Sequence, residues 1–144
     1  MGKTISFWLN NARPISLPQS LLPALTAVAL SYGAGEFNWI AAILSVAGVI
    51  LMHLGLNLAD DWFDYKVGSA EARAKVASEG FRGRMIKYPY LTSGEATHSE
   101  LLKGIILIMS ATAMIGVAVT VIRGWNILWW MAAGAVIGIS YSGG

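Results

Sequence analysis

Apolar and polar positions alternate in long blocks along this chain. Four apolar runs cover residues 15–32, 39–59, 101–122 and 125–141, and each is about 17 to 22 residues long. An α-helix of about 20 apolar residues crosses the roughly 30 Å hydrocarbon core of a bilayer with its backbone groups hydrogen-bonded internally. The pattern therefore predicts an all-α integral membrane protein with about four transmembrane helices.

Short signals mark the ends of these helices. Pro18 and Pro23 lie near the start of the first run, where a helix tolerates proline best. Thr97 and Glu100 have the spacing of a capping box, which predicts that the third helix starts at this point. Gly124 ends the third run, and the tryptophans that open the fourth run are typical of a membrane interface.

The composition supports the same class and excludes several others. Hydrophobic residues make up 56% of the 144 residues, charged residues only 12%, and the mean hydropathy is +0.59. Soluble domains contain about 25% charged residues. The chain has no cysteine, which excludes disulfides and thiolate metal sites, and its two histidines do not favour a histidine-based metal site. The formal charge of +2 reflects membrane topology, so we expect no nucleic-acid partner.

Residues 60–100 form a polar block between the second and third apolar runs. They hold seven of the eight acidic and six of the ten basic residues, which predicts a water-facing loop of about 40 residues. Nine of the ten lysines and arginines belong to the side of the membrane that holds this loop, and only Arg123 belongs to the other. The positive-inside rule therefore predicts a cell (inner) membrane protein whose N-terminus and central loop face the cytoplasm.

The most informative polar residues lie at the end of the second run. On a helix, Asn57, Asp61 and Asp64 fall at i, i+4 and i+7 and project from one face, with Asp60 beside it. Carboxylates this close repel one another unless a cation sits among them. Mg²⁺ suits such a site, since it takes one or two protein carboxylates and completes its shell with water and phosphate oxygens. The pattern predicts a magnesium and diphosphate site, although a solvated helix cap has the same composition.

Three segments carry a resemblance to a known family. They are Arg13-Pro14 before the first run, Asn57-Leu58-Ala59 leading into Asp61-Trp62-Phe63-Asp64-Tyr65-Lys66-x-Gly68, and Tyr141-Ser142-Gly143-Gly144. Together they resemble the UbiA superfamily of intramembrane prenyltransferases, and most closely its branch that acts on 1,4-dihydroxy-2-naphthoate in menaquinone synthesis. That family has nine transmembrane helices and a second Asp-rich motif. The resemblance therefore implies that residues 1–144 are the N-terminal part, about half, of one prenyltransferase membrane domain.

The resemblance implies a Mg²⁺-dependent transfer of a polyprenyl group from polyprenyl diphosphate to an aromatic acceptor, with loss of the acceptor's carboxylate as CO₂. Asp61 and Asp64 are then the metal ligands, and Asn57 orients the diphosphate or its metal. Asp60 stands where that branch commonly has asparagine, so it is either a further metal ligand or added negative charge. Residues 60–64 also spell the DDxxD motif of soluble isoprenoid synthases, a class that the apolar composition excludes.

Basic residues near the cluster are candidates to hold the diphosphate oxygens, arginine as a fork and lysine as a point charge. The candidates are Lys66, Arg82, Arg84, Lys87 and Arg13. Each of them also fits the membrane topology alone, as a loop charge or a headgroup anchor. His53, one turn before Asn57, is more typical of a helix-packing hydrogen-bonder than of a catalytic base.

Other functions stay open at this point. A small four-span transporter predicts a lone acid near mid-span, whereas these acids gather at one end with basic residues beside them. A non-catalytic membrane scaffold also fits the chain. So does a UbiA-type enzyme with another acceptor, such as 4-hydroxybenzoate, homogentisate or haem.

Overall fold

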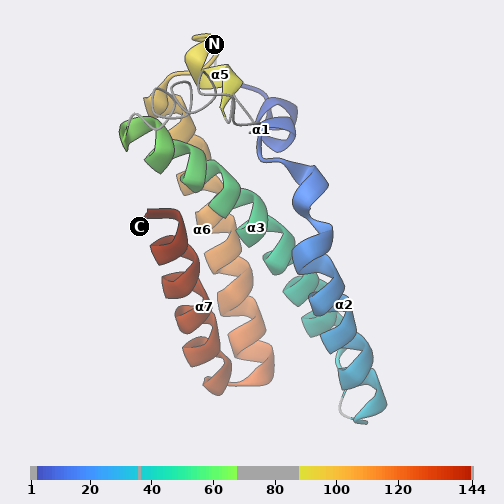
Figure 1. Ribbon diagram of the computed structural model, residues 1–144. Helices are drawn as coiled ribbons and strands as arrows, with labels where there is room; N and C mark the ends of the chain where they lie inside the picture. The colour runs from blue at the N-terminus through green and yellow to red at the C-terminus, as the bar shows by residue number, and fades with distance from the viewer. Residues whose placement is uncertain (1–2, 36, 68–87, 144) are drawn as a thin grey trace.

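A computed structural model describes residues 3–35, 37–67 and 88–143, and the described chain is all-helical (Figure 1). Its elements in chain order are α1 (Ile5–Asn11), the 3₁₀ turn η1 (Pro14–Ser16), α2 (Pro18–Gly33), α3 (Trp39–Val67), α5 (Pro89–Thr92), α6 (His98–Arg123) and α7 (Asn126–Gly143). The predicted all-α class is therefore confirmed for the described residues.

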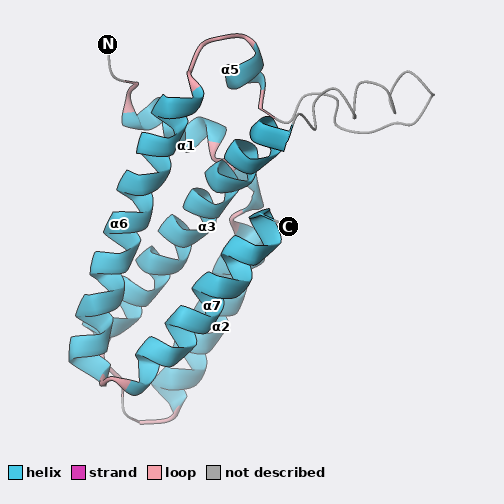
Figure 2. Cartoon of the chain, turned by 90° about the vertical axis from the view of Figure 1, so that its left-hand side faces the viewer, coloured by secondary structure: helices cyan, strands magenta, loops and turns pink. Residues whose placement is uncertain are grey.

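Two long helices, α3 and α6, form the centre of the bundle. They pack along each other, α2 lies against α3, and α7 contacts both α3 and α6 (Figures 1 and 2). Glycines let the central pair approach closely: a Cβ added at Gly55 would lie 3.2 Å from side-chain atoms of both Ile108 and Met109. At Gly48 it would lie 3.3 Å from Ile115. Small residues at a helix interface are a common packing device in membranes, because van der Waals contact has to hold the helices together there.

The apolar helices support a membrane location. Among the described residues, Trp39–Lys66 and His98–Arg123 are long and apolar enough to cross a bilayer. The apolar part of α7, Asn126–Ser140, is shorter, and α2 has 16 residues. Large apolar side chains also cover the outer surface, including Leu30 at 72%, Trp130 at 80% and Ile137 at 70% exposure. A surface of this kind is stable in lipid, and two of the four predicted spans meet the length requirement.

Helices enter the predicted polar loop from both ends. Helix α3 runs on to Val67, so Asp60, Asp61 and Asp64 lie on it, as their spacing predicted. The end of the second membrane span at residue 59 stays a prediction. The short helix α5 and the start of α6 also reduce the predicted loop from its other end, while residues 68–87 lie outside the described residues.

The helix-end signals are confirmed. The Thr97 hydroxyl accepts from the Glu100 amide at 3.2 Å, and the Thr97 amide donates to the Glu100 carboxylate at 2.9 Å. This reciprocal pair is the predicted capping box of α6. Gly124 follows α6 with φ of 99°, a conformation that glycine adopts without a Cβ clash.

We predict that filling the tight contact at Gly55 destabilises the bundle. Gly55→Leu should lower the free energy of unfolding by about 1–3 kcal/mol, because the added side chain overpacks the contact between α3 and α6. The change can be measured by titration with a denaturing detergent in mixed micelles. The matched control is Gly134→Leu, since a Cβ at Gly134 meets nothing within 4 Å. Equal destabilisation by the two substitutions would contradict the prediction.

Candidate functional site

Arg13 connects the beginning of the chain to the predicted Asp-rich face of α3. Its Nη2 atom donates to the Asn57 carbonyl oxygen at 3.0 Å and to Asp60 Oδ2 at 3.3 Å. The same nitrogen forms an ion pair with Asp61 Oδ1. The cation expected among the carboxylates is thus present as a guanidinium from the same chain. Arg13 was predicted near a diphosphate, and the structure brings it to the aspartates.

The backbone of Arg13 has an unusual conformation. With φ of 56° and ψ of 58°, it is the one non-glycine residue with positive φ among those described. The left-handed region costs an L-residue roughly 1–2 kcal/mol, and Pro14 disfavours the ordinary helical alternative for the residue before it. The Arg13 carbonyl accepts from the Ser16 amide at 3.0 Å and from the Ser16 hydroxyl at 2.8 Å. These bonds and the ion pairs hold the strained turn.

Asp61 is the most deeply buried member of the cluster, with 0% exposure. Its Oδ1 pairs with Arg13, and its Oδ2 accepts a hydrogen bond of 3.0 Å from the hydroxyl of Tyr90. Both carboxylate oxygens therefore have protein partners. A buried carboxylate is stable in its charged form only when it is paired and hydrogen-bonded. Arg13 and Tyr90 together therefore explain how the Asp61 carboxylate can be buried.

Tyr90 is a site residue that the sequence interpretation missed. It lies in α5, is only 2% exposed, and packs edge-on against Phe7 and Trp8 of α1 at centroid distances of 5.9 and 6.2 Å. Burial, and then the negative charge and hydrogen bond of Asp61, raise the pKa of Tyr90 well above its usual range. The neutral hydroxyl is therefore a hydrogen-bond donor to Asp61. The sequence alone assigns no role to Tyr90, because its partner Asp61 lies 29 residues away in the sequence.

Asn57 and His53 extend the polar contacts along the same helix. The Asn57 amide donates to the Ala12 carbonyl at 2.8 Å and to the Ser16 hydroxyl at 3.1 Å. One turn earlier, the two ring nitrogens of His53 contact the hydroxyls of Ser16 and Ser20 at 2.8 and 2.7 Å. His53 thus makes the interhelical hydrogen bonds expected of a packing residue. A direct role of Asn57 toward a diphosphate stays a prediction.

The last turns of α3 carry Asp64 and Lys66. The backbone carbonyl of Asp64 lies 3.5 Å from the Tyr88 hydroxyl. The Lys66 ammonium lies over the ring of Trp62, 5.2 Å from its centroid, and this ring stacks on His98 at 4.8 Å. Lys66 therefore lies on the Trp62 face of α3, and its role toward a diphosphate stays a prediction. Arg82, Arg84 and Lys87 lie outside the described residues, so their place relative to the site stays a prediction.

The residues present partly fit a magnesium ion. Asp60, Asp61 and Asp64 are hard oxygen donors of the kind that Mg²⁺ prefers. In the part of the chain that the structure describes, however, no three histidine, cysteine, aspartate or glutamate residues are gathered closely enough to hold a metal. One or two protein carboxylates are sufficient for Mg²⁺ when substrate phosphates complete the shell. The magnesium assignment accordingly stays a prediction that depends on a bound diphosphate.

We predict that the pair of Arg13 and Asp61 is strongly coupled. Arg13→Met should cost about 3–5 kcal/mol of unfolding free energy, because it leaves the Asp61 charge buried without its cation. Adding Asp61→Asn removes that charge, so the double variant should regain more than half of the loss. A double-mutant cycle in mixed micelles measures this coupling. Strictly additive effects of the two substitutions would contradict the ion pair's role.

We also predict that the Tyr90 hydroxyl supports Asp61. Tyr90→Phe should lower the free energy of unfolding by about 1–3 kcal/mol, since it removes a donor from a fully buried carboxylate. Tyr32→Phe is the control because the Tyr32 side chain is 65% exposed, and its effect should stay below about 0.5 kcal/mol. The same detergent titration compares them, and equal effects would argue against a structural role for the Tyr90 hydroxyl.

Comparison with known proteins gives a distant resemblance. No protein-family model matches the chain, and no solved structure matches it. The chain is 28% identical over 118 residues to the 1,4-dihydroxy-2-naphthoate octaprenyltransferase of Haemophilus influenzae, a match that covers 81% of this chain and 35% of the relative. It is 25% identical over 111 residues to the protein of that name from Escherichia coli, covering 77% of this chain and 34% of the relative. The chain therefore spans about a third of the length of these relatives, and the similarity supports a UbiA-like prenyltransferase in general.

Proposed function

We propose that this chain forms part of an intramembrane prenyltransferase that transfers a polyprenyl group from polyprenyl diphosphate to 1,4-dihydroxy-2-naphthoate in menaquinone synthesis. The observation that carries the proposal is the cluster of Arg13, Asp60 and Asp61 at the end of a membrane-length apolar helix. The names of the two relatives support the same reaction class and supply the acceptor.

The chemistry of the reaction fits the polar residues of this cluster. Breaking the bond between an allylic carbon and a diphosphate leaves negative charge on the departing group. Fixed cations stabilise that charge where it develops. When bound, Mg²⁺ would supply this stabilisation, and Asp61 and Asp64, with Asp60, are the residues proposed to hold it. Because Arg13 and Tyr90 occupy the two oxygens of the buried Asp61, Asp61 would have to exchange Arg13 for the ion. The resulting site serves departure of the diphosphate. The acceptor ring carbon then provides the electrons for the new carbon–carbon bond and loses its carboxylate as CO₂, which restores the aromatic ring.

Arg13 is proposed to bind the diphosphate oxygens. Its guanidinium has five donors in a planar fork that matches phosphate oxygens. Among the described residues, its Nε is buried and has no hydrogen-bond acceptor, so its donor capacity is not exhausted by the aspartates. Lys66, together with Arg82 and Arg84, is proposed to add positive charge on the same side. Asn57 then acts by positioning, since its amide fixes the turn that carries Arg13.

The position of the charges favours this function over a transporter. Asp60, Asp61 and Asp64 lie in the last quarter of α3, and two of them pair with an arginine instead of standing alone at mid-span. An ion-coupling acid in a small transporter is expected within the span. We further propose that the cluster faces the cytoplasm in the cell membrane, because nine of ten basic residues belong to that side.

We predict that binding of a polyprenyl diphosphate to this chain in detergent depends on Mg²⁺ and on the aspartates. Asp64→Asn should weaken binding at least tenfold, because it removes a proposed metal ligand, and chelation of Mg²⁺ should have a similar effect on the unsubstituted chain. Glu95→Gln, an exposed acid outside the cluster, is the control and should bind normally. Binding can be measured by microscale thermophoresis with a fluorescent prenyl diphosphate.

The corresponding test of turnover uses a complete gene product that contains this chain. In membranes that express it, Asp64→Asn should reduce prenyl transfer to the naphthoate acceptor by a factor of about 100 or more. Melting curves of the variant confirm that it is folded. Full prenyl transfer by a folded Asp64→Asn protein would overturn the metal assignment.

A further inference from the structure

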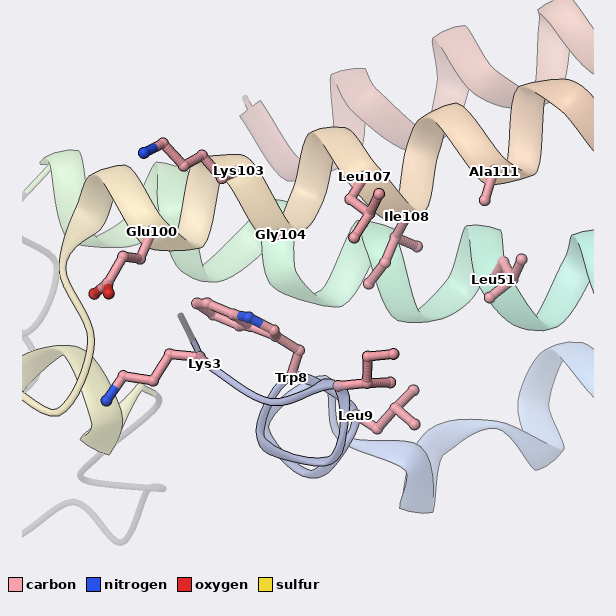
Figure 3. A pocket seen from close by; sticks show the side chains of 11 residues that line it. Lys3, Trp8, Leu9, Leu51, Glu100, Lys103, Gly104, Leu107, Ile108 and Ala111 are labelled. Atoms are coloured by element: carbon pink, nitrogen blue, oxygen red, sulfur yellow. The ribbon is translucent and has the colours of Figure 1, made fainter. Parts of the chain in front are cut away.

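A groove of about 590 Å³ opens between α1, α3 and α6, separate from the aspartate cluster (Figure 3). Most of its wall is apolar. The apolar side chains that line it include Trp8 and Leu9 of α1, Leu51 of α3, and Leu107, Ile108 and Ala111 of α6. Among the described residues, none of those in the proposed diphosphate site lines this groove.

At one end of the apolar wall, the Trp8 ring packs tightly against Gly104. A Cβ added at Gly104 would lie 3.3 Å from the Trp8 ring, so the indole lies directly against the backbone of α6. Trp8 is held from its other side by Phe7, edge-on at a centroid distance of 5.1 Å. The wall next to the polar end of the groove is consequently well packed in the absence of a ligand.

The polar end of the groove carries more positive than negative charge. Lys3, Lys103 and Glu100 line it, and Figure 3 shows all three toward the end away from Ala111, with the two lysines on opposite sides of Glu100. The Glu100 carboxylate is already engaged in the capping box, where it accepts from the Thr97 amide at 2.9 Å and the Thr97 hydroxyl at 3.1 Å. Two lysines against one glutamate give this end a formal charge of +1, which is complementary to a single phosphate diester.

The groove also has the right depth for a lipid chain. Lys103 and Ala111 are eight residues apart on α6, which corresponds to about 12 Å along the helix axis. One leaflet of a bilayer has a hydrocarbon layer about 15 Å thick. Lys103 lies near the polar end of this membrane-length helix, so a headgroup at the lysines would place its acyl chain along Leu107 and Ala111. Leu107 is 68% exposed, which leaves this wall open to the membrane.

We propose that this groove binds one anionic phospholipid, with its headgroup at the polar end lined by Lys3 and Lys103 and one acyl chain along Leu51, Leu107 and Ala111. The lysine pair selects an anionic over a zwitterionic headgroup, and the apolar wall replaces neighbouring lipid tails. Bound lipid covers the contact between α1 and α6 that the Trp8 ring makes against Gly104. This site goes beyond the proposed prenyl transfer, and its test measures lipid binding without any enzymatic readout.

We predict a headgroup preference that depends on the two lysines. Native mass spectrometry of the detergent-solubilised chain should show phosphatidylglycerol bound at least about fivefold more tightly than phosphatidylcholine with the same acyl chains. The double variant Lys3→Gln/Lys103→Gln should lose this preference. Arg123→Gln removes the same charge from the opposite end of α6 and should keep it. A preference that is absent from the unsubstituted chain, or that survives in the double variant, overturns the proposal.

Crosslinking locates the acyl chain independently of the lysines. Phosphatidylglycerol with a photoreactive group in its acyl chain should label Leu51, Leu107 or Ala111, as read by peptide mass spectrometry. Labelling confined to other faces of the bundle would overturn the proposal. Displacement of the label by an equimolar polyprenyl diphosphate would also overturn the proposal, because it would assign the groove to the substrate. Self-association that buries the groove against a second copy would overturn it as well.

Discussion

The buried charge of Asp61 is the constraint on which the polar end of this bundle depends. A carboxylate with no exposed surface is tolerated only when both oxygens are compensated, and the two partners come from opposite directions in the sequence. Arg13 precedes Asp61 by 48 residues, and Tyr90 follows it by 29. One side chain therefore joins the N-terminal turn, the end of α3 and the short helix α5. Without this junction, nothing in the local sequence would bring the three segments together.

A row of hydrogen bonds continues from this junction into the apolar part of the bundle. Asn57 and His53 lie one and two turns before Asp61 on α3 and bind the Ser16 hydroxyl of η1. Polar groups in a low-dielectric region need specific partners, so these bonds fix the position of η1 on α3 more narrowly than apolar contact can. This arrangement requires the strained backbone of Arg13. The turn at Arg13 has to direct both the Arg13 side chain and the following helix toward α3.

Helix α1 connects the aspartate cluster with the apolar groove. Its Phe7 and Trp8 pack on Tyr90, whose hydroxyl supports Asp61, while the Trp8 ring also lies against Gly104 in the groove wall. The same small helix thus packs on the residue that supports Asp61 and forms part of the groove wall. This gives a physical reason for the two aromatic residues at its centre, which on sequence grounds are only typical of a membrane interface.

The sequence by itself determined the all-α class, the order of the four long helices α2, α3, α6 and α7, and the polar face of α3. These features follow from local rules: apolar run length, the Thr97 and Glu100 capping box, glycine after α6, and the i, i+4, i+7 spacing of Asn57, Asp61 and Asp64. Only the tertiary structure decided that Arg13 is the cation at Asp61, that Tyr90 is its hydrogen-bond donor and that α1, α3 and α6 together line a groove. The reason is that these features depend on contacts between residues far apart in sequence. Local spacing determines which side chains lie on one face of a helix. The packing of the helices determines which side chains from distant parts of the sequence contact that face.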